Sequence, residues 1–115
     1  MTRASRHLLA AVLCVLPIGS ALAKMPKYDL KAYCHHVAAS SDRSKSQAIL
    51  KGCYQVEHES YNALKRIWDK LPAQTRSYCD KVARSGGAGS YIVLQGCVAE
   101  EQAAAKPGAK TPPQN

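Results

Sequence analysis

The stretch YCHHVA at residues 33–38 recurs as YCDKVA at residues 78–83, and a second short motif follows each copy. That motif is LKGC at residues 50–53 after the first copy and LQGC at residues 94–97 after the second. The order Y-C-x-x-V-A and then L-x-G-C therefore occurs twice along the chain. Self-similarity of this kind indicates a duplicated structural unit.

The cysteines of these motifs predict one disulfide within each copy. In an antiparallel hairpin that joins Cys34 to Cys53, the midpoint falls between residues 43 and 44, in a polar segment. The midpoint of Cys79 and Cys97 falls in a glycine-rich segment. Both midpoints are expected to turn. Four cysteines allow three connectivities, so nested pairing of Cys34 with Cys97 and of Cys53 with Cys79 stays open.

A glycine precedes the second cysteine of each copy, at Gly52 and at Gly96. The Cα atoms of a disulfide lie about 5.5–6 Å apart, whereas helix axes usually lie about 8–10 Å apart. A glycine inside a helix costs about 1 kcal/mol relative to alanine, so its occurrence at two equivalent places suggests a role. We expect Gly52 and Gly96 to allow close approach of the helices.

Helical spacing of apolar residues predicts four helices, and no convincing strand pattern occurs. We expect helices at about 29–39 and 73–84, a long helix that Pro72 ends, and a last helix capped by Ser90. The fold class is therefore all-α, with four helices arranged as two tandem disulfide-stapled antiparallel helical hairpins. The long helix has an inward stripe at steps of three and four: Ile49, Cys53, Val56, Ser60, Leu64, Ile67 and Leu71.

The N-terminus has the three parts of a cleavable secretory signal. Arg3 and Arg6 are basic, residues 8–18 are almost wholly apolar, and an A-x-A motif ends at Ala23. The apolar run is shorter than the roughly 20 residues that span a bilayer. We expect cleavage after Ala23 and a periplasmic or secreted protein, since an even number of remaining cysteines suits an oxidising compartment.

The expected organisation is a signal at 1–23, one helical domain at 24–105 and a tail at 106–115 whose composition predicts disorder. Within the domain, repeat one covers about 29–71 and repeat two about 73–105.

Loss of the two signal arginines lowers Lys+Arg from 16 to 14 against 8 Asp+Glu, a net charge of +6. Such a charge favours anionic partners, such as an anionic envelope component or an acidic periplasmic protein. Export and the lack of basic-aromatic interleaving argue against nucleic acid.

Metal and catalytic chemistry find little support in the sequence. His35, His36 and the E-H-E run at residues 57–59 look like a metal cluster at first. If Cys34 faces Cys53, however, His36 and His58 lie about 10 Å apart along the axis, far beyond zinc–nitrogen bonds of about 2.0–2.1 Å. No nucleophile, base and orienting group fall together. We expect no enzyme, no metal site and no cofactor.

The end of the long helix is basic and aromatic, and it is the candidate binding face. Its residues are Lys65, Arg66, Trp68 and Lys70. A face of this kind suits a partner or a membrane surface, with Trp68 partly exposed. In the alternative, Trp68 is a core residue where the long helix meets the next one.

The elements W-x-x-L-P at residues 68–72 and S-Y-x-x-L-x-x-C at residues 90–97 resemble those of small exported proteobacterial proteins of unknown function. The hairpins also resemble the twin-cysteine helical hairpins of mitochondrial intermembrane-space proteins, by analogy of fold alone. The expected function is an exported non-catalytic helical binding or envelope-associated module. The alternatives are a periplasmic stress or holdase-type protein and a small-ligand or metal carrier.

Overall fold

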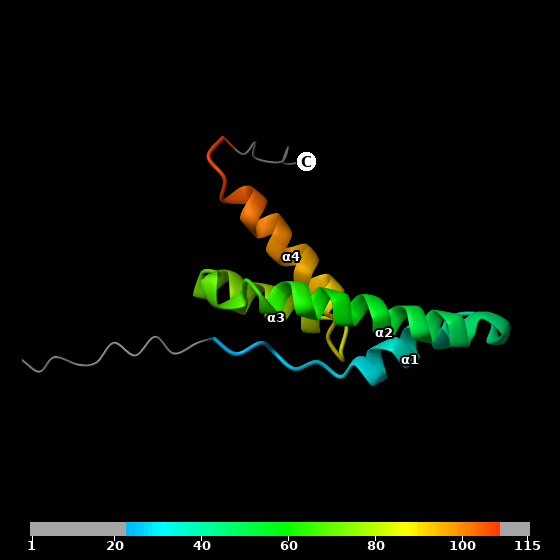
Figure 1. The fold of residues 1–115 in the computed structure, drawn as a ribbon. Helices are drawn as coiled ribbons and strands as arrows, with labels where there is room; N and C mark the ends of the chain where they lie inside the picture. The colour runs from blue at the N-terminus through cyan, green and yellow to red at the C-terminus, as the bar shows by residue number, and fades with distance from the viewer. Residues whose placement is uncertain (1–22, 109–115) are drawn as a thin grey trace, which may run out of the picture.

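The computed structural model describes residues 23–108, which are helical apart from the first segment and the connections (Figure 1). These residues contain no strand, and the all-α fold class is confirmed. The predicted signal through residue 22 and the tail from residue 109 lie outside the described residues. The elements are α1 (Leu30–Ala39), α2 (Arg43–Lys65), the 3-10 helix η1 (Trp68–Lys70), α3 (Ala73–Arg84) and α4 (Tyr91–Ala104).

Local capping explains where two of these helices begin, and a proline precedes a third. The Asp29 carboxylate accepts a hydrogen bond from the Ala32 N–H at 3.0 Å, at the start of α1. The Ser90 hydroxyl accepts one from the Val93 N–H at 3.3 Å, at the start of α4. Pro72 precedes α3, where the chain must turn after η1. The Asp29 and Ser90 caps satisfy backbone donors that a helix leaves unpaired, so local sequence contributes to both starts.

The helices form two hairpins, α1 with α2 and α3 with α4, and a disulfide joins each pair. The Cα atoms lie 5.6 Å apart in Cys34–Cys53 and 5.5 Å apart in Cys79–Cys97. All four cysteines are buried. The predicted pairing is confirmed, and the nested alternative is wrong.

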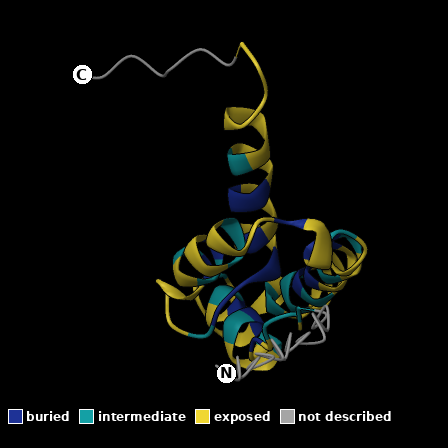
Figure 2. Cartoon of the chain, turned by 90° about the vertical axis from the view of Figure 1, so that its left-hand side faces the viewer, coloured by how far each residue is buried: buried dark blue, intermediate teal, exposed yellow. Residues whose placement is uncertain are grey.

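The two hairpins meet where α4 packs on α2. Figure 1 shows α4 crossing the long α2 and then rising away from it. Burial is concentrated around this crossing, while the outer turns of α4 are mostly exposed (Figure 2). The core cluster contains Tyr28, Leu64, Trp68, Leu71, Cys79, Ala83, Tyr91, Leu94, Cys97 and Val98.

The inward stripe of the long helix differs from the prediction in two ways. First, α2 ends at Lys65, and the chain reaches Leu71 through a 3-10 turn rather than a continuous helix. Second, Val56 is 42 % exposed, whereas Glu57 is 0 % exposed and takes the inward position. An apolar pattern favoured Val56, but the face that meets α4 passes through residue 57.

The prediction that Gly52 and Gly96 allow close helix approach is wrong. Both glycines are exposed, and a Cβ added at either would meet nothing within 4 Å. Each lies one position before its cysteine, and adjacent helical residues point about 100° apart, so the glycines face outward. The close approach occurs at Gly89 instead. Its φ is +86°, and a Cβ there would lie 2.5 Å from the Tyr28 ring.

Candidate functional site

Residues 23–28, which we call the N-terminal strap, run as a non-helical segment ahead of α1 (Figure 1). The Trp68 indole N–H donates to the Lys24 carbonyl at 2.9 Å. The Tyr91 hydroxyl donates to the Pro26 carbonyl at 2.8 Å and accepts from the Tyr28 N–H at 3.1 Å. Trp68 belongs to η1 and Tyr91 to α4, so these hydrogen bonds fix the strap to both elements.

A cluster of aromatic rings holds the C-terminal end of the strap. The Tyr28 and Tyr91 ring centres lie 4.6 Å apart, and Tyr61 approaches Tyr91 edge-on at 5.0 Å. The Tyr28 hydroxyl donates to Asp80 at 2.7 Å, and the Arg84 guanidinium lies 4.9 Å from the Tyr28 ring centre. Burial, followed by the hydrogen bond to Asp80, raises the pKa of Tyr28. Burial also raises the pKa of Tyr91.

A buried carboxylate joins α2 to the start of α4. Glu57 accepts hydrogen bonds from the Ser90 hydroxyl and from the Tyr91 N–H, each at 2.6 Å. A carboxylate is favoured at a helix N-terminus because free N–H groups and the helix dipole converge there. The cap therefore comes from the other hairpin, and it fixes the direction in which α4 leaves α2.

Sequence reasoning missed this role of Glu57, which stood out only as part of an apparent metal cluster. One signal was available. Glu57 lies four residues after Cys53 and three before Ser60, so it belongs to the inward stripe by spacing.

A cleft of about 440 Å³ opens between the strap and the end of α2. Strap residues 23–27 form one side, and Tyr61 and Lys65 of α2 with Trp68 and Asp69 of η1 form the other. Its lining surface is mainly apolar, and its apolar side chains are Ala23, Met25, Pro26, Tyr61 and Trp68. The strap thus creates the cleft by lying across the end of α2.

Positive charge surrounds the cleft. Lys24, Lys27 and Lys65 line it and are exposed, and Asp69 is the one acidic residue among the lining residues. Within residues 23–108 the single ion pair joins Arg84 to Asp80, so the three ammonium groups have no carboxylate within 4.0 Å there. The local field therefore favours an anion.

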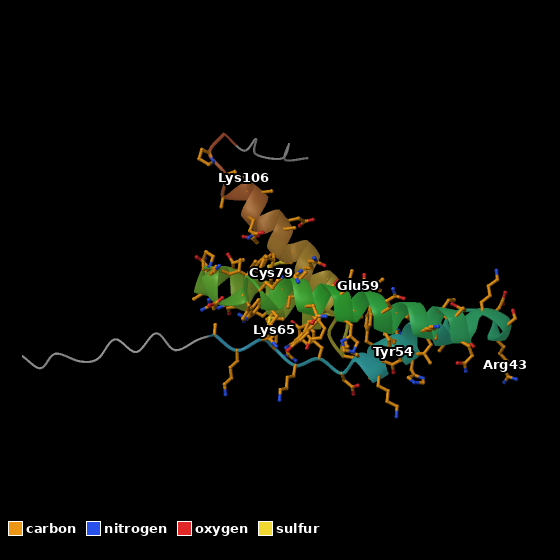
Figure 3. The ribbon with its side chains drawn as sticks, viewed as in Figure 1. Arg43, Tyr54, Glu59, Lys65, Cys79 and Lys106 are labelled. Carbon is orange, nitrogen blue, oxygen red and sulfur yellow. A yellow bond between two sulfur atoms is a disulfide. The ribbon has the colours of Figure 1, made fainter. Side chains whose placement is uncertain are left out.

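The four residues of the predicted binding face do not form one surface. Trp68 is 4 % exposed, so the alternative that places it in the core is correct and a partly exposed Trp68 is wrong. The strap covers its indole, and sequence periodicity carries no sign of this contact. Lys65 lies on the side of α2 where the strap runs (Figure 3). Arg66 and Lys70 are exposed but do not line the cleft.

The fold does not group the three histidines that the structure describes into a site. His35, His36 and His58 are all exposed. In the part of the chain that the structure describes, no three histidine, cysteine or acidic residues are grouped in a way that could hold a metal ion.

No helix between residues 23 and 108 has the length and apolarity needed to cross a membrane. The two disulfides indicate an oxidising, exported environment. No family model matches the chain, no curated protein sequence matches it significantly, and no solved structure does so either.

Proposed function

We propose that the protein is an exported, non-catalytic binding module that takes an anionic, single-chain envelope lipid in the cleft beneath its N-terminal strap. The observation that carries this proposal is the arrangement of Lys24, Lys27 and Lys65 around a mainly apolar wall. An amphiphilic anion combines the two properties that this arrangement complements. The periplasm or the secreted space is the compartment, supported by the N-terminal signal pattern and by the disulfides.

The size and chemistry of the cleft suit a small ligand rather than a second folded protein. Its 440 Å³ lies within the range of about 300–1,000 Å³ found for small-molecule sites, which are mostly apolar with a few polar groups. The acyl chain would pack on Met25, Pro26 and Tyr61, close to the Trp68 indole, while the lysine ammonium groups would contact the head group. Burial of the chain contributes affinity roughly in proportion to its apolar area.

The scaffold around the cleft is preorganised. Trp68 and Tyr91 position the strap by hydrogen bonds, and the Cys79–Cys97 disulfide holds α3 to α4. A site that is ordered before binding loses less conformational freedom when the ligand arrives. The buried cross-links therefore support affinity for a small ligand without any part in chemistry.

The first test is a titration followed by fluorescence, because Trp68 is the one tryptophan of the chain and lines the cleft. Dodecanoate should shift or quench the emission and should bind more weakly at high salt, since the Debye length falls from about 10 Å at 0.1 M to about 3 Å at 1 M. Dodecanol and dodecyltrimethylammonium, with the same chain, should bind far more weakly. Equal binding of dodecanol would contradict the proposal and favour a general apolar binder of the holdase type.

The second test uses charge reversal with a matched control. Lys27→Glu with Lys65→Glu should weaken dodecanoate binding and leave the melting temperature nearly unchanged, because exposed charges add little to stability. Lys45→Glu with Lys51→Glu makes the same change in net charge at exposed positions outside the cleft. If both pairs weaken binding equally, the overall charge binds the anion and the cleft does not.

A further inference from the structure

The start of the strap coincides with the expected site of signal cleavage. Ala23, the last residue of the A-x-A motif, lines the cleft together with Lys24. The Lys24 carbonyl is held by the Trp68 indole at 2.9 Å, so the backbone of this residue is fixed at the cleft. The bond that a signal peptidase would cut therefore lies at the mouth of the site.

We propose that signal cleavage completes the anion site, because the new α-amino group of Lys24 becomes a fourth cation at the cleft. This inference rests on the proposed function and names how the affinity of that site rises on processing. Water adds across the Ala23–Lys24 amide. The carboxylate stays on Ala23 and departs with the signal, while the ammonium group stays on Lys24.

The structure supplies two reasons for this assignment. The amino group and the anchored carbonyl belong to one residue and are separated by a few covalent bonds, so the new charge cannot move far from the cleft. An α-amino group is also largely protonated at neutral pH, so cleavage adds almost a full positive charge.

The charged groups around the new Lys24 ammonium group determine whether it is free to bind an anion. Lys27 lies on the same strap, Lys65 lies on the opposite side of the cleft, and Asp69 is the acidic residue on that opposite side. On the other side of the strap, Arg76 and Asp80 of α3 line a shallow depression that also includes Lys24. Asp80 is already bonded to Tyr28 and Arg84. Cations thus outnumber free carboxylates at the new terminus, which leaves it available for a ligand.

Processing would change both the space and the charge of the cleft. Before cleavage, Ala23 lines the cleft, and an uncharged amide stands where the ammonium group later lies. Anion binding is then stronger in the processed protein than in the precursor. A precursor would compete less well for anionic amphiphiles before export.

The experiment compares three forms of the chain, obtained by cleavage of a removable fusion or by ligation. One begins at Lys24 with a free amine, one begins at Lys24 with an acetylated amine, and one begins at Ala23. Dodecanoate is the test ligand, dodecanol is the neutral control, and Trp68 fluorescence gives the affinity. We expect acetylation to weaken dodecanoate binding by about twofold to fivefold, the size of one exposed charge pair. Dodecanol binding and the melting temperature should not change.

Several results would overturn the inference, and they differ from failure of the proposed function. Equal dodecanoate affinity of the free and acetylated forms would show that the amine has no part in the site. A lower melting temperature on acetylation, with unchanged affinity, would show that the amine pairs with Asp69 as a structural anchor. An intact mass that places the start of the exported protein elsewhere would remove the premise. If no form binds dodecanoate, the proposed function itself fails.

Discussion

Glu57 and Tyr91 join the two hairpins, because the buried carboxylate on α2 accepts the first N–H of α4 at 2.6 Å. The same carboxylate accepts the Ser90 hydroxyl, so one side chain from the first hairpin caps the last helix of the second. The orientation of α4, and with it the position of the Tyr91 hydroxyl that holds the strap, depends on this contact. Glu57 therefore links the interior of the fold to the geometry of the cleft.

Replacement of Glu57 should destabilise the protein strongly. Glu57→Leu leaves the Ser90 hydroxyl and the Tyr91 N–H without an acceptor, and each unsatisfied buried group costs about 1–3 kcal/mol. Glu57→Gln keeps one acceptor oxygen and should lose less. Urea unfolding measures the difference, with the exposed Glu59→Gln as a control expected to stay within about 0.5 kcal/mol of wild type. Equal losses at positions 57 and 59 would refute the cap.

Replacement by alanine should destabilise the protein at one glycine and stabilise it at two others. Gly89→Ala places a Cβ 2.5 Å from the Tyr28 ring at a φ of +86°, so it should destabilise the protein and displace the strap. Gly52→Ala and Gly96→Ala fall inside helices in open space and should stabilise it by about 0.5–1 kcal/mol each. Thermal melts of the three variants give the signs. Destabilisation by Gly52→Ala would restore the close-approach explanation.

Each disulfide lies within one hairpin, so a cut in the backbone between the hairpins should separate the two halves of the chain. Trypsin cuts after Lys65, Arg66 or Lys70, between the two bridges, should release one peptide set containing Cys34–Cys53 and another containing Cys79–Cys97 without reductant. A disulfide that joins the two peptide sets, detected by mass spectrometry, would contradict this pairing. Replacing Cys79 and Cys97 by alanine should cost about 3 kcal/mol on the chain-entropy account.

Alkaline pH should weaken the fold through Tyr28. Burial and the hydrogen bond to Asp80 raise the pKa of Tyr28 in the folded protein, whereas an unfolded tyrosine ionises at about pH 10. The folded state then binds more protons than the unfolded state, so this stabilisation is complete below about pH 10 and is lost as the pH rises further. Melting temperatures measured across that range should fall less steeply for Tyr28→Phe than for wild type. If the melting temperatures of both proteins fall in parallel with pH, the assignment of this pH dependence to Tyr28 is contradicted.

The features that sequence reasoning predicted are those set by local chemistry. The caps at Asp29 and Ser90, the bounds of α3 and the pairing of the cysteines follow from residues close in sequence or from an internal repeat. The exposed face predicted around Trp68 was wrong because the N-terminal strap covers this residue. The strap comes from a distant part of the sequence and has no periodic pattern. Its hydrogen bonds join residues 44 to 65 positions apart, which no local pattern encodes.

The strap also has a consequence for the order in which the molecule takes shape. Its residues are synthesised before the rest of the described chain, yet the hydroxyl that holds Pro26 belongs to Tyr91, 65 residues later. Contacts over such distances form late, because a long loop must close before they contribute. The earliest part of the fold to be made is therefore the last to dock. A chain that ends before α4 would lack the Tyr91 hydroxyl and with it the anchor of the strap at Pro26.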